Sequence, residues 1–416
     1  MISKTVLGTV LRDQSQEFES LRDSVPRSVL PALSGYPGAS ALVVKGLRRC
    51  GKSTLLKQIA KSRFGDDFLY FNFDDERIAG FGAEDFQALL ETAIELFGKK
   101  KNLLLDEIQN VRGWELFVNR VLREGFRVFI TGSNANLLSR ELGTHLTGRH
   151  TDIELYPFSF AEYLRAKGAL PSETRWYSTE EKARLSGHFK EYLEKGGMPE
   201  AVVFSNPAVL TQVLNDIIQK DVVTRYRLRK PDEFKVVAKF LIANAGNPFS
   251  YRSITNNFGI KSPNTVQKYI RYAEETYLVF TVRRYERKLK LLEKNPQKVY
   301  CVDNGIITRN TLVLTERKGA LLENVVAVHL KRLGKDFFYH RSRAGECDFV
   351  IPDEKKAIQV CYEMNANNQK RELAGLNQAM RETRAKEGLL LTLEQEQSLD
   401  GRTVKPVWQW LLENEP

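Results

Sequence analysis

The sequence has little sulfur and no long apolar segment: four cysteines and four methionines occur among 416 residues, and no apolar run approaches 18 residues. The missing apolar run excludes a helix that crosses a bilayer. The N-terminus, MISKTVLGTVLRDQSQEF, lacks the apolar core and small-residue cleavage site of a secretory signal. The cysteines show neither CxxC pairs nor zinc-ligand spacing, and are Cys50, Cys301, Cys347 and Cys361. We therefore expect reduced thiols, a cytoplasmic location and no membrane partner.

The remaining composition is that of a globular protein with an uneven charge. Hydrophobic residues make up 42% and charged residues 28% of the chain, and the length predicts two to four domains. Residues 225–300 contain 17 Lys or Arg and 6 Asp or Glu, a net charge of +11 that equals the net charge of the whole chain. A basic excess confined to one segment indicates a surface for a phosphate backbone, although a solvated helix face is the alternative.

The segment GLRRCGKST, residues 46–54, predicts a nucleotide site. It joins an expected buried strand at 40–44 to an expected helix at 53–63, and Gly46 and Gly51 permit the tight path of a phosphate-binding loop. Lys52 should reach the β- and γ-phosphates of ATP, and the Ser53 hydroxyl should bind Mg²⁺. The other expected nucleotide-binding positions of this loop are Arg49, Cys50 and Thr54.

Two further strand ends carry polar residues suited to the same chemistry. The apolar strand 102–105 runs into Asp106, expected in the magnesium shell, and Glu107, expected to polarise the attacking water. A strand at 127–131 ends near Ser133 and Asn134, either of which could sense the γ-phosphate.

An arginine at the far end of a helix is the candidate for a residue acting in a neighbouring subunit. The helix expected at 136–146 is followed by Arg149, which could serve as an arginine finger. The alternative is a helix-end arginine that interacts with the helix dipole, and Arg140 is a weaker candidate finger.

The apolar strands alternate with helices, which predicts an α/β fold with a parallel sheet covered on both faces. The expected strands are 41–44, 67–72, 102–105, 127–131 and 151–155. The phosphates should lie at the carboxyl ends of these strands.

The ordered set GLRRCGKST, LLLDEIQ, FITGSN, LTGRH and LYPFSFAEYL resembles the predicted AAA+ ATPases of bacteria and archaea that carry a C-terminal DUF4143 region. The resemblance covers nearly the whole chain. It implies Lys52 and Ser53 for phosphate and Mg²⁺, Asp106 and Glu107 for metal and water, and Arg149 as the finger. It also implies a homo-oligomer, such as a hexameric ring. Cys50 departs from the family pattern, and its thiol either packs inertly or makes the site oxidation-sensitive.

Residues 157–230 are expected to form a helical lid after the ATPase core at 1–156. A helix over 188–195 should stop at Gly196-Gly197, which matches the family's glycine pair, with Pro199 following. The next helix is expected over 208–226. Arg225 is the candidate second sensor.

Residues 231–303 predict a winged helix-turn-helix. Helices are expected at 233–245 and 251–258, and a third begins after Ser262 as N-cap and Pro263 as first residue. Strands at 279–284 and 298–302, with a basic tip between them, would form the wing. The expected DNA contacts are Asn264, Thr265, Gln267, Lys268, Arg271, Arg287, Lys288 and Lys290, with Lys294 also in the tip. Winged helices also bind proteins, so the fold alone does not establish DNA binding.

Residues 304–416 resemble a PD-(D/E)xK nuclease fold. The expected order is a helix at 320–332, a hairpin of 337–341 and 347–351, a strand at 356–362, a helix and a short strand. Glu323 and Asp348 supply two carboxylates for Mg²⁺, but Gln359 and Cys361 stand where an active enzyme has Glu and Lys. We therefore expect a degenerate nuclease site, with Glu363 as a remote substitute for Gln359.

The fold class predicted overall is an α/β multidomain protein with an AAA+ core. The predicted function is ATP hydrolysis at subunit interfaces, coupled to remodelling of, or translocation on, double-stranded or branched DNA. A nucleotide-controlled regulatory or defence-type switch is the alternative. Kinase-like transfer is disfavoured, because Glu107 directly after Asp106 favours water as the acceptor.

Overall fold

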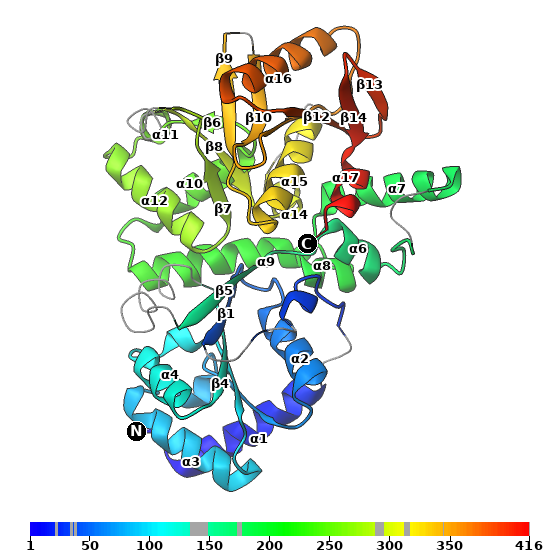
Figure 1. Ribbon diagram of the computed structural model, residues 1–416. Helices are drawn as coiled ribbons and strands as arrows, with labels where there is room; N and C mark the ends of the chain where they lie inside the picture. The colour runs from blue at the N-terminus through cyan, green and yellow to red at the C-terminus, as the bar shows by residue number, and fades with distance from the viewer. Residues whose placement is uncertain are drawn as a thin grey trace. The chain divides into compact units, whose positions relative to one another are not determined.

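The computed structural model describes residues 1–20, 24–33, 36, 40–133, 149–172, 177–287, 295–311, 317–343 and 345–415 (Figure 1). The chain divides into two compact units, Met1–Tyr156 and Pro157–Pro416, and each contains an apolar core cluster. None of the helices in these ranges is long and apolar enough to cross a membrane.

The first unit is built on a five-stranded sheet with the order β2-β3-β4-β1-β5. Its strands are β1 (Ala41–Gly46), β2 (Phe68–Asn72), β3 (Asn102–Asp106), β4 (Arg127–Gly132) and β5 (His150–Leu155). All four pairings are parallel, so the parallel α/β sheet predicted from the alternating strands and helices is confirmed. The carboxyl ends of all five strands meet at one edge of the sheet, which places the loops that follow them close together.

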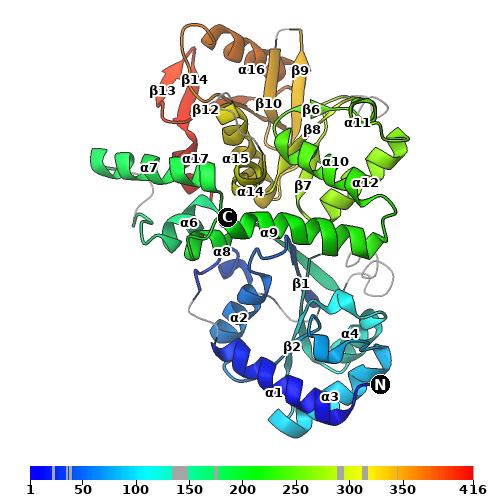
Figure 2. The ribbon, with the colours of Figure 1, turned by 180° about the vertical axis from the view of Figure 1, so that it is seen from behind.

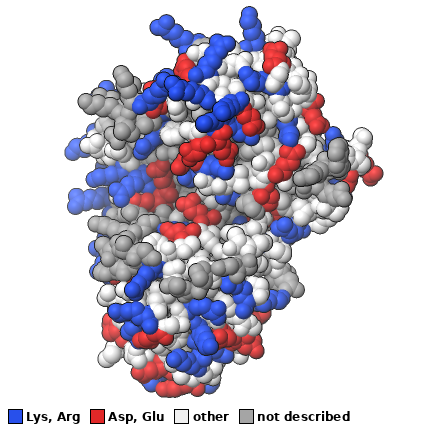
Figure 3. Space-filling model, in the orientation of Figure 1, with Lys and Arg blue, Asp and Glu red and all other residues white. Residues whose placement is uncertain are grey.

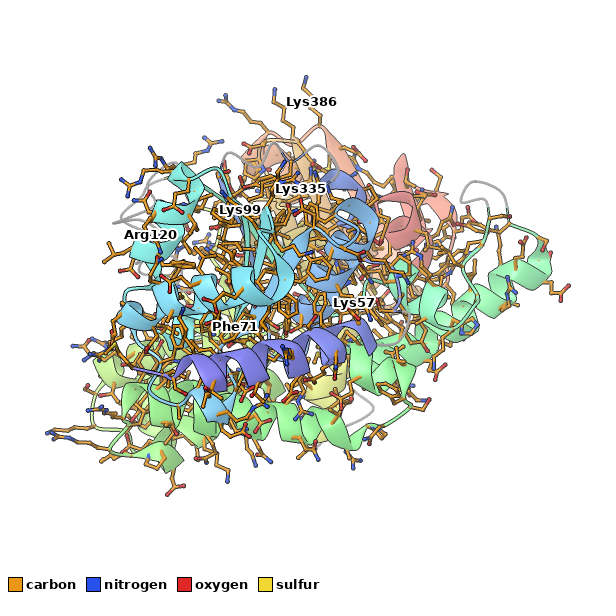
Figure 4. All side chains as sticks on the ribbon, turned by 90° about the horizontal axis from the view of Figure 1, so that it is seen from below. Lys57, Phe71, Lys99, Arg120, Lys335 and Lys386 are labelled. Carbon is orange, nitrogen blue, oxygen red and sulfur yellow. The ribbon has the colours of Figure 1, made fainter. Side chains whose placement is uncertain are left out.

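Helices cover this sheet. They are α1 (Lys4–Ser20), α2 (Lys52–Arg63), α3 (Phe86–Phe97) and α4 (Trp114–Arg123), with 3-10 turns at Pro31–Leu33, Glu76–Ile78, Ala83–Asp85 and Ile108–Asn110. Figure 4 looks onto α1, with Phe71 of β2 behind it, and both belong to one core cluster. Leu7, Val10 and Leu11 of α1 are fully buried there, and each contributes roughly 1.5–3 kcal/mol.

The second unit begins with helices α6 (Phe160–Ala166), α7 (Thr179–Lys195), α8 (Pro199–Val203) and α9 (Ala208–Asp216). As predicted, α7 stops at Gly196, which has φ 72°. The helix expected over 208–226 differs, because after α9 the chain continues as a π-helix over Ile217–Thr224. A π-helix turn holds more residues than an α-turn. A periodic pattern of apolar residues does not reveal this change of hydrogen bonding.

Three helices and two strands follow in the order that the sequence predicts, and a short strand at 248–249 that was not predicted joins the two in a small sheet. They are α10 (Pro231–Ala243), α11 (Tyr251–Phe258) and α12 (Pro263–Glu275), with β6 (Pro248–Phe249), β7 (Val279–Val282) and β8 (Gln297–Cys301) in the antiparallel order β6-β8-β7 (Figure 2). Ser262 caps α12 by accepting a hydrogen bond from the Thr265 N–H. The strand expected to reach residue 284 ends at Val282, and Arg284 instead bridges to Tyr339.

The rest of the unit contains a six-stranded mixed sheet with the order β13-β14-β12-β11-β10-β9. Its elements are α14 (Asn304–Asn310), α15 (Lys318–Arg332), β9 (Phe338–Ser342), β10 (Gly345–Ile351), β11 (Lys356–Val360), α16 (Gln369–Thr383), β12 (Glu387–Thr392), β13 (Gln397–Leu399), β14 (Arg402–Pro406) and α17 (Val407–Glu413). The predicted β9–β10 hairpin is present. Three strands and a helix follow α16 where one short strand was expected. Gln397 and Ser398 of β13 are exposed and β14 buries only Val404 and Pro406, so neither strand carries a clear apolar pattern.

Candidate functional sites

The turn between β1 and α2 has the backbone that a phosphate-binding loop requires. Gly46 has φ 153°, and a Cβ on it would lie 2.2 Å from the Leu155 carbonyl oxygen, so no other residue fits. Gly51 caps α2 with φ 97°, and Arg49 is also left-handed at φ 61°. Cys50 is buried, its thiol donates to the Leu155 carbonyl at 3.3 Å, and burial raises the pKa of that thiol. This thiol is packed as part of the loop's support.

Lys52 begins α2 and points back over the loop. Its ammonium donates to the carbonyls of Gly46 at 3.3 Å and Leu47 at 3.2 Å and lies 3.6 Å from Glu107 Oε1. Burial pushes the pKa of Lys52 down, but the charge of Glu107, with Cys50 and Asp106, outweighs it and leaves the pKa raised. The lysine is therefore charged at neutral pH.

Asp106 ends β3 within a ring of hydroxyl groups. The Thr131 hydroxyl donates to Oδ1 and the Tyr70 hydroxyl donates to Oδ2 at 2.8 Å, and Ser53 is also hydrogen-bonded to this carboxylate. Burial and then the charge of Glu107 raise the pKa of Asp106 above its usual value. The predicted metal residues, Ser53 and Asp106, are therefore brought together by the fold.

Glu107 is held by the side chains of Lys52, Gln109 and Ser133. It has a left-handed backbone with φ 51°, and its carboxylate accepts hydrogen bonds from Gln109 and from the Ser133 hydroxyl. Burial acts to raise the pKa of Glu107, but the charge of Lys52 and the hydrogen bond from Gln109, with Arg48 and Ser133, together outweigh it and the pKa is lowered. Glu107 is therefore ionised at neutral pH. Asn134, the other predicted sensor, lies outside the described residues, as does the segment with Arg140.

Arg149 lies at the amino-terminal end of the parallel strands, whereas the loop follows their carboxyl ends. β5 runs parallel to β1 with His150 beside Ala41 and Leu155 beside Gly46. Arg149 is the residue before His150. At the rise of a β-strand it lies about 16 Å along the strands from Gly46, where the loop begins. Its guanidinium is exposed and donates to Asn119 in α4 at 3.2 Å. Arg149 therefore does not reach the loop of its own chain.

The predicted DNA-contacting residues of α12 share its exposed face. Asn264, Gln267, Lys268 and Arg271 are exposed, whereas Val266, Tyr269, Ile270 and Ala273 are buried. Figure 3 shows Lys and Arg side chains gathered along the edge where Figure 1 places α12. Thr265 is half-buried against Ser262, and Arg271 is paired with Glu275 at 2.7 Å. Lys288, Lys290 and Lys294 lie outside the described residues.

Arg287, expected to lie along a phosphate backbone, is engaged within the chain. Its guanidinium donates to the Glu382 carbonyl at the end of α16 at 2.6 Å. Arg225, the candidate second sensor, pairs with Asp221 at 3.5 Å.

Three of the four residues of the predicted degenerate nuclease site lie together. Glu323 of α15 and Asp348 of β10 both contact Lys298, and the Asp348 N–H donates to Gln359 Oε1 at 3.3 Å. The Gln359 amide donates to Glu372 of α16 at 2.6 Å. Cys361 lies past the end of β11, and its thiol donates to the Glu363 carbonyl. Glu363 is exposed, so it does not take the place of Gln359.

Three family models match consecutive parts of the chain: an AAA domain over residues 39–164, the domain of unknown function DUF8612 over 186–317, and the domain of unknown function DUF4143 over 318–410. An uncharacterized protein of Methanocaldococcus jannaschii, MJ1544, is 34% identical over 393 residues, which cover 89% of this chain and 88% of that protein. The chain belongs to the AAA+ ATPases that carry a C-terminal DUF4143 domain.

Other relatives of this AAA+ protein are similarly uncharacterized. One from Haemophilus influenzae is 33% identical over 346 residues, covering 78% of this chain and 83% of its own length. Among solved structures, the S. cerevisiae Hsp104–ADP complex is 12% identical with a TM-score of 0.33, covering 94% of this chain and 73% of that chain. A DNA polymerase III gamma subunit-related protein of Thermotoga maritima is 10% identical with a TM-score of 0.25, covering 64% and 99%.

Several residues around the AAA+ site are absent from the sequence prediction. Arg27 is buried, and its guanidinium donates to the carbonyls of Cys50 at 2.8 Å and Tyr156 at 2.5 Å. Arg27 lies outside every motif of the sequence, so its neighbours in the chain do not indicate that it supports the loop. Tyr70 and Thr131 donate their hydroxyls to Asp106 and lie on strands that were predicted. Their position as polar residues near the ends of those strands was the signal that could have identified them. Gln109 stands two residues after Glu107 within the quoted LLLDEIQ.

Proposed function

We propose that this AAA+ protein hydrolyses ATP at interfaces between copies of the chain and couples hydrolysis to remodelling of, or translocation on, double-stranded or branched DNA. The observation that supports it best is the arrangement of Lys52, Asp106 and Glu107 around one glycine-built loop. Hydrolysis of a nucleoside triphosphate requires a lysine for the phosphates, a carboxylate that binds the metal ion and an ionised base for the water. Lys52, Asp106 and Glu107 have the side chains for these three roles.

The residues present fit Mg²⁺ and ATP. The loop has no room for a Cβ at Gly46, and the buried ammonium of Lys52 is directed at backbone carbonyls and one carboxylate. Lys52 would hold the phosphates, and Ser53 and Asp106 would hold the magnesium ion. When bound, Mg²⁺ withdraws charge from the phosphate oxygens and ATP supplies the phosphoanhydride bond.

Glu107 is the group we assign to the proton of the attacking water. Its lowered pKa keeps the carboxylate ionised, which is the form that accepts a proton. Ser133 and Gln109 fix the orientation of the carboxylate by their hydrogen bonds to it. Ser133 would thereby link the end of β4 to the position of the base.

The placement of Arg149 supports an oligomeric enzyme. An exposed arginine that lies across the sheet from its own loop is suited to a site on a neighbouring copy. An arginine supplied in this way stabilises the charge that develops on the transferred phosphoryl group. We therefore propose a closed ring, such as a hexamer, in which Arg149 completes the neighbour's site.

The face of α12 supports DNA as the partner. Helices α10–α12 with β6–β8 form what we interpret as a winged helix, and the exposed residues of α12 offer amides and cations of the kind that contact bases and phosphates. The segment 225–300 carries the whole net charge of the chain, which favours a polyanion over an uncharged partner.

We propose that the C-terminal domain does not cleave DNA. The Gln359 side chain is turned to Glu372 and to the backbone of Asp348, and Cys361 cannot replace a lysine. Metal-dependent cutting by the purified protein that disappears in Asp348→Ala would contradict this assignment.

ATP turnover measured with no DNA, duplex, single-stranded and branched DNA tests the proposal. We expect stimulation by duplex or branched DNA, and loss of that stimulation in Lys268→Ala/Arg271→Ala with basal turnover unchanged. Lys335→Ala is the matched control, because it removes a partly exposed lysine of the C-terminal part that is paired with Glu354. Turnover that ignores every DNA, together with slow release of ADP, would instead favour the nucleotide-controlled switch that acts through protein contacts.

A further inference from the structure

A buried lysine lies at the centre of three carboxylates in the second unit. The Lys298 ammonium is 2.8 Å from Glu323 Oε1, 2.5 Å from Glu346 Oε1 and 3.1 Å from Asp348 Oδ1, and its side chain is 1% exposed. An ammonium has three N–H donors, so one is available for each carboxylate. The hydrogen-bonding capacity of this lysine is therefore fully used inside the protein.

The lysine and the carboxylates come from different elements. Lys298 is on β8, in the small sheet beside α12, whereas Glu323 is on α15 and the other two carboxylates are on β10. Tyr300, also on β8, donates its hydroxyl to Glu323 at 2.6 Å. The contact thus joins the sheet of the interpreted winged helix to the sheet of the DUF4143 domain.

Further hydrogen bonds run alongside this contact. The Tyr339 backbone of β9 pairs with Arg283 and Tyr285, which follow β7, and the Tyr339 hydroxyl donates to the Pro296 carbonyl at 2.6 Å. Asn324 of α15 bonds both backbone groups of Cys301 at 2.8 Å. The lysine is therefore one part of a continuous junction.

The charges at this junction call for a cation. The three carboxylates share one ammonium as their partner, and their side chains are 13%, 31% and 7% exposed for Glu323, Glu346 and Asp348. Negative charges held this close repel one another most strongly where water is excluded, as it is around Asp348. The cation nearest to all three is the Lys298 ammonium, which lies within 3.1 Å of an oxygen of each carboxylate. Burial lowers the pKa of Lys298, yet Glu323 and the other neighbours outweigh it and raise the pKa well above the usual value.

We infer that Glu323, Glu346 and Asp348 form a cation site whose resident cation is the chain's own Lys298 ammonium. The lysine keeps divalent cations out and fastens β8 to the DUF4143 domain. The helix α12 and the C-terminal sheet are consequently tied together and move as one body. This inference goes beyond the proposed function and needs neither nucleotide nor DNA for its test.

Binding of Mn²⁺ to the full-length protein without nucleotide tests the site directly. We expect Lys298→Met to bind one more Mn²⁺ per chain than the wild type by electron paramagnetic resonance titration. The extra ion should disappear in Lys298→Met/Asp348→Asn. A wild type that binds the same ion, lost on Asp348→Asn, would overturn the inference, as would a folded Lys298→Met that binds no additional ion.

Thermal unfolding gives the second measurement. Removing one partner of a buried ion pair leaves the others uncompensated, so Lys298→Met should melt lower by about 5–10 °C, and millimolar Mn²⁺ should recover part of that loss. Lys335→Met removes a lysine that is 37% exposed and paired with Glu354, and it should melt within about 1 °C of the wild type. Equal melting of the two variants would overturn the fastening role.

A measurement on the wild type covers the case in which Lys298→Met does not fold. Acylation of lysines followed by mass spectrometry should leave Lys298 unmodified while Lys335 reacts, because the Lys298 side chain is 1% exposed and that of Lys335 is 37% exposed. Addition of MnCl₂ should not change this. If Mn²⁺ exposes Lys298 to the reagent, a metal competes for the site and the lysine is not its resident cation.

Discussion

Substitution of Glu107 by glutamine separates nucleotide binding from hydrolysis. The change keeps the side chain's size and its hydrogen bond from Ser133, but removes the negative charge that lies 3.6 Å from the Lys52 ammonium. An amide does not accept a proton from water at neutral pH. Loss of a general base lowers turnover by about 10²–10⁴-fold, or roughly 3–5 kcal/mol in the activation free energy.

Nucleotide affinity should move in the opposite direction. Glu107 and the phosphates compete for Lys52, and the gross attraction between Lys52 and Glu107 is about 4 kcal/mol at an effective dielectric constant of 20. If a quarter of that attraction remains after desolvation, its removal tightens ATP binding by about 1 kcal/mol, or roughly fivefold in Kd. The pKa of Asp106 should also fall, because Glu107 is one of the groups that raise it.

Phosphate release at saturating Mg²⁺ and ATP measures turnover, and titration with a fluorescent ATP analogue measures affinity. Glu91→Gln is the matched control, since Glu91 is an exposed carboxylate of α3 paired with Lys4. Turnover at the parental rate would refute Glu107 as the base. A Kd raised more than about tenfold would refute the competition for Lys52.

Three other predictions concern the loop, the finger and the DNA-facing helix. Gly46→Ala places a Cβ 2.2 Å from the Leu155 carbonyl oxygen at a residue with φ 153°. Titration with the same ATP analogue should therefore show at least a tenfold loss of affinity, about 1.4 kcal/mol. Unchanged affinity would show that the loop relaxes around the methyl group. Arg149→Ala should bind ATP normally and lose about 10³-fold in turnover, and mixing it with Glu107→Gln should restore phosphate release in mixed oligomers, whereas no restoration would contradict a site shared between copies. Affinity for duplex DNA should fall about 10³-fold between 50 and 200 mM salt if six or more phosphates are contacted. Lys268→Ala/Arg271→Ala should reduce the steepness of log K against log salt by about 2, because two cations are removed. A flat salt response would exclude a phosphate backbone as the ligand.

The candidate nucleotide site was largely predictable because its information is local. A strand, a glycine-bearing turn and a helix start are encoded within residues 40–63, and the parallel sheet follows from apolar strands separated by helices. The five strands, their parallel pairing and the meeting of Ser53, Asp106 and Glu107 are all present. The glycines Gly46 and Gly51 were identified from spacing, and their positive φ values give the physical reason for them.

Residues that act over long separations were not predictable from spacing. Arg27 supports Cys50 and Tyr156, and α1 covers β2, without any motif that announces either. The π-helix at Ile217–Thr224 also escapes a pattern that assumes one helical period. For Arg27 and α1 the determining contacts join segments far apart in the sequence, whereas the π-helix is a local change in hydrogen bonding.

Lys298 of β8, whose ammonium contacts carboxylates of the DUF4143 domain, shows the difference most clearly. Local sequence predicted Glu323 and Asp348 as a pair of carboxylates, with Gln359 and Cys361 where a glutamate and a lysine were expected. It offered no reason to connect Lys298, 50 residues before Asp348, with that pair. The pairing of β8 with its sheet and the packing of α15 against it bring the ammonium to the carboxylates, since a buried negative cluster is stable only with a cation. Which cation fills the cluster is a property of the folded chain, because only folding sets the distance between those side chains.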